Sequence, residues 1–230
     1  MPRSPFKPRW WQRLLSYFWL VRLPTPPSTV TPSLEVRLSD GRLVVDATGV
    51  NYAFGGLDHF FRAAFRRLGI PEAQMQKVLI LGFGSGNVAT ILREWETGPP
   101  LDITGVEQDG SMLEIGRRYF HLDELEPLEL KIQDAAAYVR QAPQKQFDLI
   151  VVDLFVEDVV PQRFTTTAFL KKLGALLRPR GLLFFNRLMD TEQHRRESEA
   201  FLTHMQAALP GTTGRRVQRN LVCLYRAAGS

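Results

Sequence analysis

Lys77-Val-Leu-Ile-Leu-Gly-Phe-Gly-Ser-Gly-Asn87 joins an unbroken apolar run to a loop with glycine at every second position. An apolar run without alternation is typical of a strand whose sheet is covered on both faces. The spacing of Val88, Ile91, Leu92 and Trp95 predicts a helix directly after the loop. Glycines at such a junction let a ligand approach the backbone, and the start of the helix offers free N–H groups. The segment therefore predicts a strand–loop–helix unit that binds a ligand.

Strand and helix patterns continue to alternate after this loop. Further strands are predicted at 102–106, 128–132, 147–152 and 181–185, and the segments between them have helical periodicity. Such repetition predicts a mostly parallel α/β sheet with helices on both faces. The last two predicted strands, 213–218 and 221–225, are too close for a helical crossover, so we expect an antiparallel pair at one end. A sheet that ends in this way resembles the class I methyltransferase (Rossmann-like) fold.

Three acidic residues follow predicted strands. Glu107 comes about 20 residues after the glycine loop, where an acidic residue hydrogen-bonds ribose hydroxyls in nucleotide-binding sheets. Asp134 can cap the next helix or, as in similar folds, reach an adenine amino group, and the sequence leaves both roles open. Asp153 follows an apolar strand end at the sheet edge where ligands bind. A carboxylate there can face a cationic sulfonium or a substrate amine.

The glycine spacing distinguishes two classes of cofactor. A dinucleotide fingerprint has its third glycine one place after Gly86, where this chain has Asn87. Gly82, Gly84 and Gly86 instead resemble the Gly-x-Gly-x-Gly loop of enzymes that use S-adenosylmethionine.

A small β element is predicted before the α/β pattern. Leu34–Leu38 and Leu43–Asp46 alternate around Asp40-Gly41, which is typical of a β-hairpin with a type I′ turn. A helix with apolar positions between Leu57 and Leu68 follows. We therefore divide the chain into an N-terminal segment with a Pro-rich linker (1–33), a β element (34–56) and a cofactor-binding domain (57–230).

Residues 1–23 combine basic and aromatic side chains, and no acidic residue precedes Glu35. The set comprises Arg3, Lys7, Arg9, Arg13 and Arg22 with Trp10, Trp11, Phe18 and Trp19. Three interpretations are open: a short helix that packs on the domain or on a second subunit, a peripheral contact with an anionic membrane, and a nucleic-acid patch. We expect the aromatic face to be covered. We also expect residues 1–30 to be dispensable for folding, because the Pro-rich linker separates them from the core pattern.

Composition narrows the kinds of site that the chain can hold. Cys223 is the only cysteine, which excludes a disulfide framework and a Cys-rich metal site and suits a cytoplasmic location. The four histidines show no metal-ligand spacing, so we expect surface histidines and no metal. They are His59, His121, His194 and His204.

Residues 34–187 resemble the spermidine synthase family. The resemblance rests on the helix from Leu57, the Gly82–Gly86 loop, Val106-Glu107, Gln133-Asp134-Ala135 and Phe147–Asp153. Spermidine synthases transfer an aminopropyl group from decarboxylated S-adenosylmethionine to putrescine. The resemblance implies that Gly82, Gly84, Gly86, Glu107 and Gln108 hold the adenosyl part, that Asp134 and Ala135 hold the base, and that Asp153 faces the reacting end as the catalytic residue.

Two departures from the family pattern concern the acceptor. The family loop after the fourth strand usually carries a second Asp that helps deprotonate the attacking amine, whereas this chain has Val156, with Glu157 and Asp158 beside it. The family's N-terminal element usually has Tyr followed by His or Gln and Glu, whereas this chain has Tyr52-Ala-Phe-Gly-Gly56. Tyr52, Glu157 and Asp158 are therefore substrate candidates, and we expect putrescine to be a poor acceptor.

The sequence predicts a spermidine synthase-like transferase that moves a methyl or aminopropyl group to a small, amine-bearing acceptor. Its cofactor would be S-adenosylmethionine or the decarboxylated form. A true spermidine synthase and a non-catalytic binding module that kept the fold are the alternatives. The expected partners are a small-molecule substrate, a second subunit of a homodimer and a membrane surface at residues 1–23. Nucleic acid is not a favoured partner. Asp153-Leu-Phe-Val lacks the Asn/Asp-Pro-Pro-aromatic motif of base amino-group methylases. Cytosine C5 methylation needs a cysteine nucleophile near the site, whereas Cys223 lies on a predicted last strand.

Overall fold

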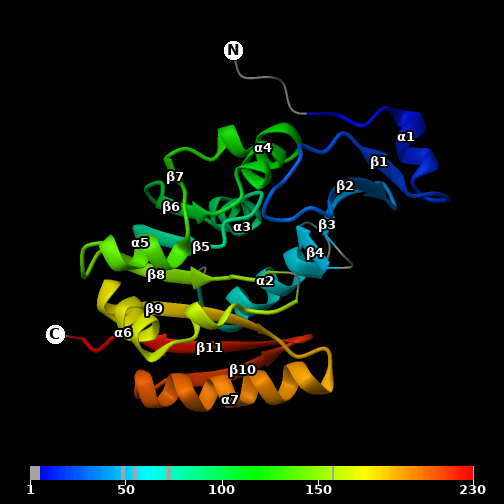
Figure 1. Ribbon diagram of the computed structural model, residues 1–230. Coiled ribbons are helices and arrows are strands. Elements are labelled where there is room, and N and C mark those ends of the chain that lie inside the picture. Colours follow the sequence, from blue (N-terminus) through cyan, green and yellow to red (C-terminus); the bar gives the residue numbers. More distant parts are fainter. Residues whose placement is uncertain (1–5, 48–49, 54–55, 71–73, 157, 230) are drawn as a thin grey trace.

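The computed structural model describes residues 6–47, 50–53, 56–70, 74–156 and 158–229. Figure 1 shows a large central sheet with helices on both faces and a small second sheet near the N-terminus. The two sheets lie side by side, and helix α4 lies between them.

The central sheet has seven strands in the order β10-β11-β9-β8-β5-β6-β7. Strands β5 to β9 are parallel to one another, whereas β11 is antiparallel to both β9 and β10. This arrangement confirms the predicted class I methyltransferase-like sheet with its terminal antiparallel pair. The strands are β5 (Lys77–Leu81), β6 (Asp102–Glu107), β7 (Leu128–Ile132), β8 (Phe147–Val152), β9 (Leu177–Leu188), β10 (Thr213–Val217) and β11 (Asn220–Arg226).

Three helices cover each face of this sheet. One face packs against α2 (Gly56–Arg67), α3 (Asn87–Glu94) and α4 (Gly110–Tyr119), and the other against α5 (Ala135–Gln141), α6 (Thr167–Leu176) and α7 (Glu192–Ala208). Two short 3-10 turns, Leu122–Glu124 and Gln162–Phe164, connect these elements. Side-chain caps fix where four of the helices begin, and each such cap contributes about 1 kcal/mol. The capping residues are Asp109, Asp134, Thr166 and Thr191.

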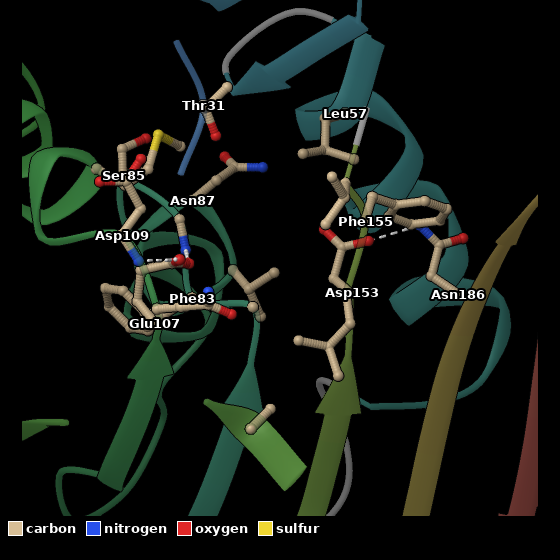
Figure 2. A pocket seen from close by; sticks show the side chains of 18 of the residues that line it. Thr31, Leu57, Phe83, Ser85, Asn87, Glu107, Asp109, Asp153, Phe155 and Asn186 are labelled. Atoms are coloured by element: carbon tan, nitrogen blue, oxygen red, sulfur yellow. Dashed lines mark hydrogen bonds between the residues drawn. The ribbon is translucent and has the colours of Figure 1, made fainter. Parts of the chain in front are cut away.

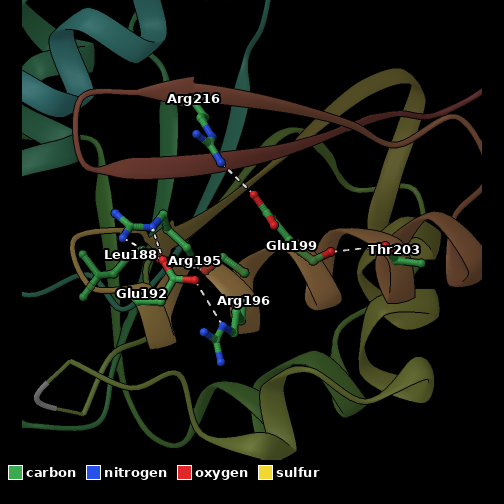
Figure 3. A network of polar contacts seen from close by, with 8 residues as sticks. Leu188, Glu192, Arg195, Arg196, Glu199, Thr203 and Arg216 are labelled. Carbon is green, nitrogen blue, oxygen red and sulfur yellow. Dashed lines mark hydrogen bonds and ion pairs between the residues drawn. The ribbon is translucent and has the colours of Figure 1, made fainter.

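Helix α7 carries ion pairs on its outer face (Figure 3). Glu192 pairs with Arg195 and Arg196, and Glu199 pairs with Arg216 of β10. Exposed pairs of this kind contribute at most about 1 kcal/mol each, so the buried side chains on the opposite face of α7 dominate its attachment. This buried face packs on β9, where the ring of Phe201 lies against that of Phe185.

The N-terminal sheet has four antiparallel strands in chain order. The elements are α1 (Trp10–Leu15), β1 (Val21–Leu23), β2 (Leu34–Ser39), β3 (Arg42–Ala47) and β4 (Val50–Ala53). Asp40 (φ 49°) and Gly41 (φ 73°) both have positive φ, as a type I′ turn requires, so the predicted hairpin is confirmed. The short strands β1 and β4 were not expected from the sequence.

The segment from β1 to β2 is attached to α4. Leu23 is buried in the same apolar cluster as Val36 and Tyr119. The Tyr119 hydroxyl donates a 2.6 Å hydrogen bond to the carbonyl of Pro24, and the Ser28 hydroxyl donates a 2.5 Å bond to Asp109. The Pro-rich segment is thus packed against α4, and a deletion that ends near residue 30 would remove β1 and its pairing with β2. That residues 1–30 are dispensable for folding stays a prediction, which such a deletion tests.

Candidate functional site

A cavity of about 380 Å³ lies at the carboxyl ends of the parallel strands. The glycine loop after β5 and the end of β6 form one wall, and the segment after β8 with the end of β9 forms the opposite wall (Figure 2). Val30, Thr31 and Leu34 from the N-terminal element and Leu57 from α2 also line the cavity. The cavity therefore opens at the sheet edge where ligands bind in parallel α/β folds.

The glycine loop has a backbone that side chains would not tolerate. Gly82, Gly84 and Gly86 have φ values of 79°, 58° and 101°. A Cβ atom on Gly82 would lie 2.2 Å from the carbonyl oxygen of Asp153. Glycine thus lets the loop after β5 touch the loop after β8, which brings the two walls of the cavity together. Gly82 and Gly84 line the cavity, whereas Gly86, the residue before α3, lies behind it.

Glu107 supports the glycine loop from below. One carboxylate oxygen accepts the Gly84 N–H at 2.8 Å, and the other accepts the Asp109 N–H at 2.9 Å. Burial raises the pKa of Glu107, and these backbone donors oppose the shift. Each oxygen has further acceptor capacity, so the carboxylate can accept ligand hydroxyls while it holds the loop.

Unpaired polar atoms lie beside Glu107. The Ser85 hydroxyl and both polar atoms of the Asn87 side-chain amide are buried and have no hydrogen-bond partner among the described residues. Both residues line the cavity, and Figure 2 places their side chains on the same wall as Glu107 and Asp109. Leaving such groups unpaired costs about 1–3 kcal/mol each. This wall therefore fits a ligand that offers both donors and acceptors.

Asp153 occupies the opposite wall at the end of a chain of amides. Its carboxylate accepts a 2.8 Å hydrogen bond from the Asn186 side chain, whose own oxygen accepts one of 2.8 Å from Asn220. Burial raises the pKa of Asp153 to about 6, the Asn186 bond opposes the shift and the nearby Glu107 adds to it. Asp153 is thus a desolvated carboxylate, and a cationic ligand would offset the cost of its burial.

Two more carboxylates line the cavity on either side of a buried histidine. His194 is only 8% exposed, so the expectation of a surface residue was wrong for it. Its Nδ1 lies 2.5 Å from Asp190 and its Nε2 lies 3.4 Å from Asp158. The first turn of α7 places His194 behind the cavity, because Thr191 caps that turn. Asp158 and Asp190 face the cavity.

Asp134 takes the capping role that the sequence left open. It accepts the Ala137 N–H at 2.9 Å, and its second oxygen pairs with Arg163 at 3.0 Å. Asp134 itself is absent from the cavity lining, whereas Gln108 and Ala135 belong to it. Arg163 lines the cavity as well, and its guanidinium also reaches Gln108 at 3.4 Å. Asp134 consequently acts on the cavity through Arg163.

The other residues singled out in the sequence are Tyr52, Val156, Glu157 and Cys223. The side chain of Tyr52 and the whole of Glu157 lie outside the described residues. Val156 lines the cavity, and its backbone pairs with that of Val159. Burial raises the pKa of the Cys223 thiol to about 12, so it carries no thiolate at neutral pH. Within the described ranges, no group of three His, Cys, Asp or Glu side chains is placed to hold a metal.

Sequence reasoning missed several residues of the cavity. Asp109 had a detectable signal, because an Asp immediately before a predicted helix is typical of a cap. Ser85 and Asn87 stand in the glycine loop itself, but only the structure shows that their polar atoms are unpaired. The others come together only through the fold, since β9, β11, the segment after β8 and the first turn of α7 meet at one edge. The missed residues are Ser85, Asn87, Asp109, Arg163, Asn186, Asp190, His194 and Asn220.

Comparisons with known proteins agree with this architecture. The polyamine aminopropyltransferase of Vibrio vulnificus is 29% identical over 128 residues, which cover 55% of this chain and 42% of that protein. The N-terminal histidine N-methyltransferase of Emericella nidulans is 31% identical over 182 residues, which cover 75% of this chain and 28% of that protein. The chain thus spans less than half the length of these curated relatives.

A solved structure shares the fold at low sequence identity. The spermidine synthase of Thermotoga maritima superposes with a TM-score of 0.73 at 17% identity, over 91% of this chain and 74% of that one. The model of the spermine/spermidine synthase domain matches residues 68–214. Because this match covers well over half of the sequence, the chain belongs to the spermine/spermidine synthase domain family.

Proposed function

We propose that this protein is a transferase that uses an adenosyl sulfonium cofactor and acts on an amine. The observation that carries the proposal is the pairing of two unlike walls in one cavity. One wall has Glu107 with the unpaired Ser85 and Asn87, and the other has the desolvated carboxylate of Asp153. The first suits a nucleoside with a polar tail, and the second suits a positive charge.

The residues of the first wall fit S-adenosylmethionine or its decarboxylated form. Glu107 would accept the ribose hydroxyls, and Ala135 with Gln108 would border the base. Ser85 and Asn87 would satisfy the polar groups of the tail, which removes the cost of leaving them unpaired. When bound, a sulfonium of this class supplies an electrophilic carbon to a nucleophile. The contribution of the protein is then mainly the positioning of two reactants.

An acidic patch favours an amine as the acceptor. Asp153, Asp158 and Asp190 line one side of the cavity. An ammonium group would be attracted to them and must lose a proton before it can attack. Asp158 and Asp190, held by His194, are the residues that we assign to bind the amine and accept that proton. They would take the place of the family's second Asp, which this chain lacks at Val156.

The names of the relatives support two kinds of transfer. One relative is named an aminopropyltransferase and another an N-methyltransferase. The first name contains a polyamine, and the second specifies transfer to nitrogen. We therefore propose nitrogen as the accepting atom and leave methyl and aminopropyl as the two groups to be tested. A cytoplasmic location stays a prediction from the sequence.

Replacing Glu107 with Ala should weaken the binding of adenosyl ligands. The expected loss is about 1–3 kcal/mol, because the ribose hydroxyls would lose a buried acceptor. Calorimetry with S-adenosylmethionine, its decarboxylated form, methylthioadenosine and adenosylhomocysteine measures the loss and ranks the ligands. Glu114→Ala is the matched control, since Glu114 is exposed on α4. If the wild type binds none of the four ligands at millimolar concentration, the proposed cofactor is wrong.

Putrescine should be a poor acceptor for the wild-type protein. Val156 cannot accept a proton, so the loop lacks the family's second carboxylate in register. The assay compares putrescine with other small amines, in the presence of each cofactor form. Asp158→Asn and Asp190→Asn should lower the transfer rate to whichever amine reacts best and leave the affinity for adenosylhomocysteine unchanged. Spermidine production at about 10 per second, a median enzyme rate, would contradict the prediction.

A further inference from the structure

The described part of the N-terminal segment presents apolar side chains to solvent. We define the N-terminal patch as the exposed large hydrophobic residues Trp10, Trp11, Leu14, Leu15, Tyr17, Phe18, Trp19 and Leu20. The side chains of Trp10, Phe18 and Trp19 are 74%, 77% and 69% exposed. We expected the aromatic face to be covered, but the described residues of the chain do not bury it. Contiguous exposed patches of this kind mark interaction sites.

The patch is displayed on a backbone that the domain holds in place. The Ser16 hydroxyl accepts the Gly41 N–H at 2.8 Å, and the Ser16 carbonyl accepts the Asp40 N–H at 3.0 Å. Farther along the chain toward the N-terminus, the Phe6 N–H donates a 2.8 Å bond to the Arg118 carbonyl, and the Phe6 ring packs on Tyr119. Figure 1 shows α1 and β1 at the outer end of the small sheet, away from the central sheet. The aromatic side chains thus project from a fixed support.

The charges around the patch indicate its partner. Lys7, Arg9 and Arg13 are exposed beside the aromatic side chains, and the first acidic residue, Glu35, pairs with Arg22. Asp40, in the turn that bonds to Ser16, is two residues before Arg42, so residues 40–42 carry no net charge. A symmetric contact between two copies would bring the same cations together. The complementary surface is therefore anionic as well as apolar.

We propose that the N-terminal patch binds an anionic lipid bilayer at its interface. Trp and Tyr rings settle at the level of the headgroups, where one side of the ring is apolar and the other is wet. Each Lys or Arg near an anionic surface contributes about 1 kcal/mol. Among the described residues, no helix is long and apolar enough to cross a membrane. The contact is accordingly peripheral, and it does not depend on the proposed transferase activity.

The test uses the full chain and vesicle flotation. The probes are vesicles of phosphatidylcholine alone and of phosphatidylcholine with one third phosphatidylserine, each at low and high salt. We expect flotation with the anionic vesicles at low salt, weaker flotation at high salt and little with the neutral vesicles. Equal binding to both vesicles, or no binding to either, would overturn the proposal.

Substitutions separate the aromatic and basic contributions. The triple variant Lys7→Glu, Arg9→Glu and Arg13→Glu should lower the partition coefficient by about 100-fold or more, because three favourable charges are lost. Trp10→Ser with Trp19→Ser should also reduce flotation. Ile132→Ser and Arg140→Glu are the controls, since both residues are exposed outside the patch and the cavity lining. They should float like the wild type.

Two further measurements keep other causes apart. All variants should unfold at the same temperature as the wild type, which shows that they are folded without relying on the proposed function. Light scattering coupled to gel filtration reports the oligomeric state. If the wild type is a dimer and the patch variants are monomers that float normally, the patch is a subunit interface and the membrane proposal fails.

Discussion

Replacing Asp153 with Asn is expected to abolish group transfer while it stabilises the fold. Transfer should fall by roughly 100-fold or more, the usual cost of removing one electrostatic contact to the reacting centre. The free energy of unfolding near pH 8 should rise by about 1–3 kcal/mol, since a desolvated charge becomes neutral. The Asn side chain can still accept the hydrogen bond from Asn186. Thermal denaturation and a transfer assay measure the two effects.

Asp148→Asn is the matched control because Asp148 lies at the start of β8, whereas Asp153 directly follows its end. Asp148 accepts the backbone N–H groups of Gln76 and Lys77 and pairs with Arg178. Its substitution should therefore lower the free energy of unfolding and leave transfer unchanged. The opposite signs of the two variants distinguish a functional carboxylate from a structural one. Wild-type transfer by Asp153→Asn would refute the role that we assign to Asp153.

The same residue predicts how ligand affinity depends on pH. Its pKa is about 6 in the folded chain, compared with 3.8 for an ordinary Asp. The affinity for a cationic adenosyl ligand should therefore increase as the pH rises through about 6, because the carboxylate becomes ionised. Asp153→Asn should remove this dependence. Calorimetry across the range checks it, and an affinity that decreases with rising pH would contradict the assignment.

Fold stability should change with pH in the opposite direction. Between pH 3.8 and about 6, the folded chain holds a proton on Asp153 that the unfolded chain has released. The free energy of unfolding contributed by this group therefore falls as the pH rises through the window, and it is constant above it. The ionised form of Asp153 thus favours ligand binding, whereas the protonated form favours fold stability, which is typical of a functional carboxylate.

The local signals in the sequence were sufficient for the central sheet. The apolar run of β5, the glycine loop and the helical periodicity after it each depend on neighbouring residues, so they can be recognised without the fold. The short strands β1 and β4 could not be recognised in this way, because a segment of three or four residues shows too little periodicity. Their pairing depends on β2 and β3, which supply the partners.

Only part of the candidate site could be predicted from the sequence. Glu107 and Asp153 lie at strand ends, where topology alone predicts a role in binding. His194 and Asp158 are far apart in the sequence and meet because α7 begins where the loop after β8 passes. No spacing rule contains that contact. For Asp134 the sequence left a helix cap and a ligand contact open, and the structure shows the cap together with an ion pair to Arg163.

Replacing Gly82 with Ala should be the most destabilising substitution in the glycine loop. The new Cβ atom would lie 2.2 Å from the carbonyl oxygen of Asp153, and the φ of 79° is itself unfavourable for Ala. Backbone strain and steric overlap together should lower the free energy of unfolding by about 2–5 kcal/mol. The adenosyl affinity should also fall, because any relief of the overlap moves the loop after β8 and with it Asp153.

Gly211→Ala and Gly84→Ala separate the two causes. Gly211 has a φ of 92° and nothing within 4 Å of its Cβ position, so its variant measures backbone strain alone, at a residue outside the cavity lining. Gly84 has a φ of 58°, and its Cβ would meet nothing closer than 3.6 Å, so its variant measures strain within the loop. Each should cost about 1–2 kcal/mol. If Gly82→Ala is no more destabilising than these two, close contact between the loops after β5 and β8 does not join the two walls of the cavity.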